Sequence, residues 1–177
     1  MHPNEATIQR LYTAFAALDA RAMSACYASS ACFDDPGFRL NGRRQISGMW
    51  HMLCDAARDN AREDWQLTFS QVQANALSGQ AQWEAKYRFS RTRRLVHNRV
   101  TSRFSFSQQG LIESQVDDFD LWRWSRQAIG LGGYVLGWTP FFRTQMRRQT
   151  HEALGRYMAK HDAPDPDEFE PTWKMDL

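Results

Sequence analysis

The stretch YASSACFDDPG, residues 27–37, decides which fold the sequence predicts. Its second half, from Cys32 onward, predicts a short strand that runs into a turn, because Pro followed by Gly favours a chain reversal. On its N-terminal side, residues 4–18 place apolar side chains three and four positions apart, which predicts an amphipathic helix with Asn4 as its N-cap. A second short helix follows Asp19 and leads into the strand, and Gly42 precedes a third helix.

After Asp64 the hydrophobic period changes from 3.6 to 2, which is typical of half-buried strands. The alternating runs are residues 65–69, 83–89 and 99–106. Turn signals at Ser78-Gly79 and at residues 108–110 predict antiparallel pairing, and a last strand is expected from about Leu111 to Trp122. This order, in which helices come first and strands follow, predicts an α+β fold. The polar face of each strand predicts a curved antiparallel sheet that helices cover on one side.

The C-terminal third predicts two more helices. One extends from Trp124 to Ile129 and stops at Gly130, and the other begins at Thr139-Pro140 and continues to about Lys160. The second helix should bury four apolar side chains and expose four arginines, which are Phe142, Met146, Leu154 and Tyr157, and Arg143, Arg147, Arg148 and Arg156. Such a helix either packs on its own domain or a dimer mate, or lies on a membrane surface through residues 130–160.

The chain is therefore expected to form one domain over residues 1–125, with residues 126–161 as a helical extension of the same domain. Residues 162–177, rich in acids and Pro, should form a loose tail. The beginning of the sequence lacks a signal peptide and no apolar run is long enough to span a bilayer, so a cytoplasmic protein is expected.

Composition excludes several classes of function. The net charge is +2, and no basic stripe is interleaved with aromatics, so nucleic acid is not an expected partner. The three cysteines have neither metal nor redox spacing, so we expect no metal and no cofactor. Aromatic residues make up 13% of the chain, with seven Trp, and they either line a cavity or simply pack the core.

The segment from Leu18 to Pro36, in which Tyr27-Ala28 is followed by CFDDP at 32–36, resembles the NTF2-like superfamily, especially its ketosteroid isomerases and SnoaL-like polyketide cyclases. Residues 119–128 (FDLWRWSRQA) resemble a SnoaL-like subgroup with a longer C-terminus. The resemblance covers about residues 4–125. It implies a cone in which the sheet wraps around the N-terminal helices, and a homodimer through the open sheet face.

The resemblance also implies candidate catalytic residues. In ketosteroid isomerases, a known case of pKa tuning, the residue matching Asp35 is the general base, and a Tyr matching Tyr12 donates to the oxyanion. The second donor there is a protonated Asp, whose place is held here by Ser102, which argues against steroid isomerisation. SnoaL-like cyclases place acid–base function near Asp117, which makes it the second carboxylate of interest, although position 115 is Gln rather than His.

A ligand pocket for a small hydrophobic molecule follows from the same resemblance. Its expected lining is Trp50, Trp83, Tyr87, Phe104, Gln115 and Phe119. A carboxyl group among such aromatics is poorly solvated, which raises its pKa toward the working pH of a general acid or base. Limonene-epoxide hydrolases share the fold but need an Asp-Arg-Asp set, and no inward Arg lies on the strand before the last one.

Two hypotheses of function stay open. In the first, the protein is a cofactor-independent isomerase, cyclase or dehydratase in which Asp35 abstracts a proton beside a carbonyl, Tyr12 and Ser102 stabilise the enolate, and Asp117 returns the proton. In the second, the cone is a non-catalytic ligand-binding or dimerisation module. Each residue also has a structural alternative: Asp35 caps its own turn, Asp117 pairs with an Arg, Tyr12 is core and His97 is surface.

Overall fold

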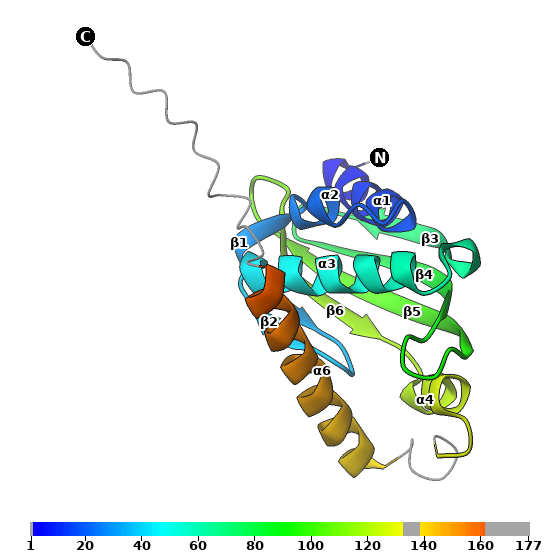
Figure 1. Cartoon of the computed structure of the whole chain (residues 1–177). Helices are drawn as coiled ribbons and strands as arrows, with labels where there is room; N and C mark the ends of the chain where they lie inside the picture. The colour runs from blue at the N-terminus through cyan, green and yellow to red at the C-terminus, as the bar shows by residue number, and fades with distance from the viewer. Residues whose placement is uncertain (1, 133–138, 162–177) are drawn as a thin grey trace.

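The computed structural model describes residues 2–132 and 139–161, which form one α+β unit (Figure 1). The elements are α1 (Pro3–Ala16), α2 (Ala20–Ser24), β1 (Tyr27–Asp34), β2 (Arg39–Asn41), α3 (Arg43–Asp59), the 3-10 helix η1 (Arg62–Asp64), β3 (Gln66–Ala74), β4 (Ser78–Arg88), β5 (Leu95–Phe106), β6 (Ile112–Asp118), α4 (Leu121–Ile129) and α6 (Pro140–His161). The fold class expected from the sequence is therefore confirmed.

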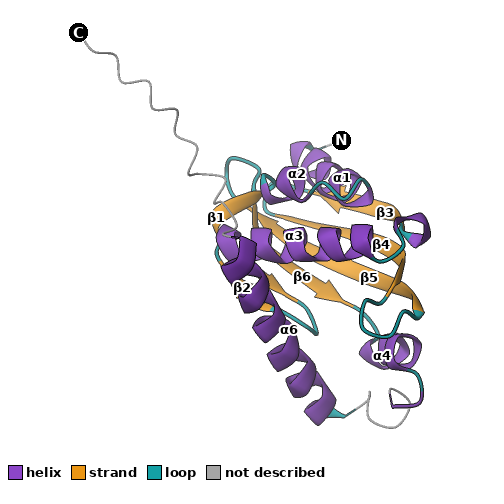
Figure 2. Ribbon diagram, in the orientation of Figure 1, coloured by secondary structure: helices purple, strands orange, loops and turns teal. Residues whose placement is uncertain are grey.

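The six strands form one sheet in the order β2-β1-β6-β5-β4-β3. The pairs between β3, β4, β5 and β6 are antiparallel, as the turn signals predict, but β1 pairs with β6 in parallel. The expectation of a purely antiparallel sheet is wrong at this one pair, because the chain comes back beside β1 only in β6, after β2, α3 and the strands β3, β4 and β5. Figure 2 shows the helices gathered on one face of the sheet.

Alternation along the strands determines which side chains face the helices. On β5, Val100, Ser102 and Phe104 are at most 4% exposed, whereas Thr101 and Arg103 lie on the outer, exposed face. The outer face of β4 and β5 is polar except at Leu95, which is exposed. A homodimer through that face stays a prediction, and it would have a polar interface.

The first helix fills the concave side of the sheet with the predicted apolar stripe, and Ile8, Leu11 and Tyr12 are fully buried. Its N-cap is His2, whose Nδ1 accepts from the backbone N–H of Asn4 at 3.2 Å, so the prediction of Asn4 as the cap is wrong. The Asn4 side chain is buried instead and donates to the carbonyl of Asn75 at 2.9 Å, which connects α1 to the turn between β3 and β4.

The last strand is shorter than the sequence predicts. It ends at Asp118 rather than Trp122, and α4 begins at Leu121 rather than Trp124. The cause is Asp120, whose carboxylate accepts from the backbone N–H of Arg123 at 2.8 Å and so caps the new helix.

The long helix α6 packs against α3 and against the turn that follows β1 (Figure 1). Thr139 caps it as predicted and Leu154 is buried, but Arg147 is not solvated as expected. Its guanidinium donates to the Asp34 carboxylate and to the Asp35 carbonyl, both at 2.8 Å. Residues 133–138 and the predicted tail at 162–177 lie outside the described residues. Among the described helices, none is both long and apolar enough to cross a membrane.

Candidate functional site

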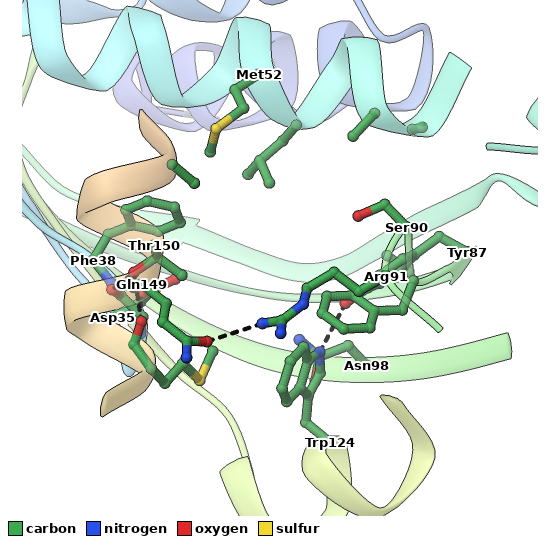
Figure 3. Close-up of a pocket in the computed structure, with 18 of the residues that line it drawn as sticks. Asp35, Phe38, Met52, Tyr87, Ser90, Arg91, Asn98, Trp124, Gln149 and Thr150 are labelled. Carbon is green, nitrogen blue, oxygen red and sulfur yellow. Dashed lines mark hydrogen bonds between the residues drawn. The ribbon is translucent and has the colours of Figure 1, made fainter. Parts of the chain in front are cut away.

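A cavity of about 860 Å³ lies between the concave face of the sheet and helices α3, α4 and α6 (Figure 3). Helix α3 contributes apolar side chains such as Met52, the strands contribute Trp83 and Tyr87, and α6 contributes Phe142 and Met146. The cavity has the size and the mainly apolar lining of a small-molecule site. Its wall depends on the C-terminal extension, because α4 and α6 close the side that the sheet leaves open.

Asp35 lines this cavity from the turn that follows β1. Its Oδ1 accepts from the backbone N–H groups of Gly37 and Phe38, each at 2.6 Å, so Asp35 does cap its own turn. The same residue also lines the cavity, so this cap is not its only contact. Its Oδ2 has no hydrogen bond to the described residues and remains available to a ligand. Burial raises the pKa of Asp35 to about 6, although the two backbone bonds and Arg147 counteract this rise.

Helix α6 holds the Asp35 turn in place. In addition to the bonds of Arg147, the hydroxyl of Thr150 donates to the carbonyl of Gly37, and Nε2 of His151 accepts from the backbone N–H of Arg39. Gly37 is packed closely, since a Cβ there would lie 3.3 Å from the Met146 methyl group. The extension therefore fixes the position of the first acid as well as closing the cavity.

Asp117 lines the same cavity from β6 and is 4% exposed. Its Oδ1 accepts from the Ser102 hydroxyl at 2.6 Å and from Nε2 of Gln115 at 2.9 Å. Burial raises the pKa of Asp117 to about 7, and the negative charge of Asp35 raises it further, while the two hydrogen bonds lower it. Within the described residues no Arg pairs with Asp117, so that structural alternative is wrong.

A buried hydrogen-bond network lies behind Asp117. Ser102 accepts from the Tyr12 hydroxyl at 2.6 Å and from the indole N–H of Trp83 at 3.0 Å. On the other side Tyr27 donates to Gln115 and accepts from the indole N–H of Trp50. Burial raises the pKa of Tyr12 and Tyr27 well above the usual value, so both phenols stay protonated.

The expected site residues thus fall into two layers. Asp35, Asp117 and three of the six predicted pocket residues (Trp83, Tyr87 and Phe119) line the cavity. Tyr12, Ser102 and the other three (Trp50, Phe104 and Gln115) lie in the wall behind it. The Ser102 hydroxyl donates to Asp117 and the Tyr12 hydroxyl donates to Ser102, so the two are placed to position the acid, Tyr12 only through Ser102.

Two cavity groups are able to donate hydrogen bonds: Tyr87, which was expected only as part of the pocket lining, and Asn98, which was not assigned a role from the sequence. The Tyr87 hydroxyl accepts from the indole N–H of Trp124 at 2.9 Å, and its own proton has no acceptor among the described residues (Figure 3). Burial raises the pKa of Tyr87 to about 12, so it keeps that proton. The Asn98 carboxamide also lines the cavity and makes no hydrogen bond to the described residues. Alternation with Val100 and Ser102 on the same strand could have identified Asn98 as inward-facing.

Other titratable groups lie away from the cavity. His97 is on the outer face of the sheet, where its Nε2 lies 2.6 Å from the Glu84 carboxylate, so the surface alternative for His97 is confirmed. In the described part of the chain, no group of three His, Cys, Asp or Glu side chains is arranged to hold a metal ion.

Comparison with known proteins now identifies the family. A model of the SnoaL-like domain matches residues 8–115, which is more than half of the chain. The chain belongs to the SnoaL-like domain family. The matched segment of this SnoaL-like protein includes the Asp35 turn and ends two residues before Asp117, so the α4 and α6 walls of the cavity lie beyond it.

Solved structures with the same fold include three whose names concern cyclisation or epoxides. A candidate polyketide cyclase from Xanthomonas campestris pv. campestris is 18% identical, with a TM-score of 0.56, and the match covers 70% of this chain and 95% of that one. SalBIII, an epoxide hydrolase/cyclase-like enzyme in pyran ring formation in the polyether salinomycin, is 14% identical (TM-score 0.57; 67% and 92% covered). An LEH-like epoxide hydrolase of M. tuberculosis is 14% identical (TM-score 0.53; 76% and 90% covered).

At these identities the likeness shows the NTF2-like fold and nothing about the reaction. No curated protein matches the sequence. The matches cover 90–95% of the three structures but only 67–76% of this chain.

Proposed function

We propose that this SnoaL-like protein is a cofactor-independent acid–base enzyme, an isomerase, cyclase or dehydratase, that moves a proton beside the carbonyl of a small apolar compound. The observation that supports this most is that Asp35 and Asp117 line one apolar cavity with pKa values raised to about 6 and about 7. A general acid or base is most effective when its pKa lies near the working pH, and such values are enriched at functional sites.

The two environments divide the roles of base and acid. Asp35 has the lower pKa, because two backbone N–H groups and Arg147 stabilise its charge, so it is the better candidate for the ionised base at neutral pH. Its Oδ2 is the oxygen left for the substrate. Asp117 is the candidate acid, because its environment is more buried and the charge of Asp35 favours its protonated form.

The enolate oxygen would be stabilised by Tyr87 and Asn98. Both line the cavity with N–H or O–H groups that have no acceptor among the described residues. In this scheme Asp35 takes a proton from the carbon beside the carbonyl, and the C–H electrons form the enolate. With a β,γ-unsaturated compound the product is a dienolate, and Asp117 gives its proton to the γ carbon, which shifts the double bond and completes an isomerisation. Alternatively the enolate carbon attacks a second carbonyl, which closes a ring, and Asp117 protonates the alkoxide that forms. Asp35 then loses its proton to water and Asp117 regains one.

The names of the similar structures favour cyclisation within this class, since two of the three refer to cyclases. Epoxide hydrolysis is less well supported, because the inward positions of β5 carry Asn98, Val100 and Ser102 and no Arg between the two acids. The non-catalytic alternative remains a ligand-binding module that uses the same cavity.

The test is proton exchange at the carbon beside a carbonyl, which does not require the natural substrate. 1-Tetralone and a small panel of related ring ketones are incubated in D₂O, and the loss of the α-proton signal is followed by ¹H NMR. We expect the wild type to accelerate exchange and Asp35→Asn to abolish the acceleration, while Asp118→Asn, on the exposed face of the same strand as Asp117, behaves as wild type.

Equilibrium dialysis of the same ketones measures affinity independently. The enzyme hypothesis predicts that Asp35→Asn retains affinity while losing exchange. Binding without acceleration by the wild type would support the binding module and contradict catalysis.

A further inference from the structure

The open side of the cavity carries a cation that has no acidic partner within residues 2–132 and 139–161. Arg91, in the connection between β4 and β5, lines the cavity and is exposed, so it lies where the cavity meets solvent. Its Nη1 donates at 2.9 Å to Oε1 of Gln149 on α6, and Figure 3 shows this bond crossing the cavity from one wall to the other. Among the described residues it is the one hydrogen bond of the Arg91 side chain.

Two other arginines, Arg88 and Arg156, line the cavity. Arg88 is held by the Asp64 carboxylate and by the carbonyl of Arg93. Arg156, on α6, is exposed and adds a second positive charge at the same opening, and no acidic side chain of the described residues lies within ion-pair distance of it. One exposed acid, Glu152, also lines the cavity, and its carboxylate lies 3.8 Å from Nε of Arg148. With Arg91 and Arg156 the exposed part of the lining still has an excess of positive charge, whereas Asp35 and Asp117 form a separate negative region.

We propose that the cavity takes an apolar carbonyl compound that also carries a carboxylate, and that Arg91 binds this carboxylate at the opening. A guanidinium presents five N–H donors in a planar fork that fits a carboxylate with two parallel hydrogen bonds. The neutral amide of Gln149 is a weaker acceptor, which a carboxylate oxygen replaces.

The distribution of charge also sets the orientation of such a ligand. A carboxylate beside Asp35 and Asp117 would meet like charge in an apolar cavity, where repulsion is poorly screened. At Arg91 it meets an opposite charge. The ligand therefore enters with its neutral carbonyl toward the acids and its carboxylate toward Arg91, which presents the carbon beside the carbonyl to Asp35.

This inference rests on the proposed function in that it uses the same cavity, but its test needs no turnover. The probes are 2-naphthylacetate and its neutral isostere 2-naphthylacetamide, measured by equilibrium dialysis at low salt and pH 8. A hydrogen-bonded pair of charges at such a site corresponds to roughly tenfold or more in affinity. We expect the wild type to bind the anion about tenfold more tightly than the amide.

Three variants locate the source of that preference. Arg91→Met should lose the tenfold preference by weakening the anion alone, while Arg103→Met, which removes the same charge from the outer face of β5, should keep it. Gln149→Ala should bind the anion at least as tightly as the wild type, because the competing acceptor is gone.

The inference is overturned if the wild type binds acid and amide equally, or binds neither. It is also overturned if Arg91→Met weakens both probes to the same extent, which would make Arg91 only part of the wall, or if Gln149→Ala weakens the anion. If the wild type does not accelerate ketone exchange but still prefers the anion, the result contradicts catalysis and supports this class of ligand.

Discussion

Ser102 and Asp117 lie directly opposite one another on strands β5 and β6, and the hydroxyl of Ser102 donates to Oδ1 of Asp117 at 2.6 Å. Because Ser102 itself accepts from Tyr12 and from Trp83, its proton is committed to the carboxylate. One oxygen of Asp117 is thus held by the wall, and the other is left for the cavity. Asp35 is arranged in the same way: backbone N–H groups hold its Oδ1, and its Oδ2 is left for the cavity.

Replacing Ser102 with Ala should raise the pKa of Asp117 above about 7, because a hydrogen bond that stabilises the charged form is lost. It should also lower the free energy of unfolding by roughly 1–3 kcal/mol, because Tyr12 and Trp83 lose their acceptor inside the core. Urea unfolding and ¹³C titration of the Asp117 carboxyl measure the two effects. Thr101→Ala, one residue away on the exposed face, is the control and should change neither.

Stability should depend on pH through the two acids. The folded protein keeps their protons up to about pH 6 and about pH 7, whereas the unfolded chain loses them near pH 4. The folded state therefore binds more protons between these limits, and the free energy of unfolding contributed by these groups decreases as pH rises from about 4 to 7.

Asp117→Asn should remove much of that decrease and stabilise the protein at pH 8 by an amount on the order of 2 kcal/mol, since no buried charge has to form. Urea titrations at pH 5 and pH 8 provide the comparison, with Asp118→Asn as the exposed control. Equal stability of Asp117→Asn and the wild type at both pH values would show that Asp117 titrates normally.

Tyr87→Phe should reduce ketone exchange about 10- to 100-fold at saturating ketone if Tyr87 donates to the enolate, because that interaction is made mainly in the transition state. The affinity for the ketone should change little. Tyr157→Phe is a suitable control, since Tyr157 donates to Asp55 away from the acids. An unchanged rate in Tyr87→Phe would remove Tyr87 from the mechanism.

Arg147→Met tests the role of the C-terminal extension. Loss of the guanidinium should raise the pKa of Asp35 above about 6, so the acidic limb of the pH–rate profile for exchange should move to higher pH. Arg148→Met removes a neighbouring charge that lies 3.8 Å from Glu152, and should leave the profile in place. If the pH–rate profile of Arg147→Met matches that of the wild type, helix α6 is not needed to hold the Asp35 turn.

The sequence predicted the parts of this fold that depend on local pattern. The period of two on β5 placed Val100, Ser102 and Phe104 inward, and the helix start at Thr139-Pro140 was found from capping rules. The same alternation contained Asn98, which was missed because an uncharged amide between His97 and Arg99 carries no distinctive signal.

What could not be predicted depends on contacts between distant segments. The parallel pairing of β1 with β6 and the contact of Arg147 with the Asp34 carboxylate, 113 positions away, have no local trace in the sequence. The sequence also could not show that Tyr12 and Ser102 lie behind the cavity wall. Both face inward, and only the packed structure shows that Tyr12 donates to Ser102 and Ser102 to Asp117.

The central claim is that Asp35 and Asp117 form a coupled pair of acids in one apolar cavity. The most direct measurement is a ¹³C NMR pH titration of their side-chain carboxyls in the wild type and in Asp35→Asn. The account predicts pKa values near 6 and near 7 in the wild type, and a lower pKa for Asp117 in the variant, because the charge of Asp35 is gone. Two carboxyls that titrate near pH 4, with Asp117 unaffected by the substitution, would contradict it.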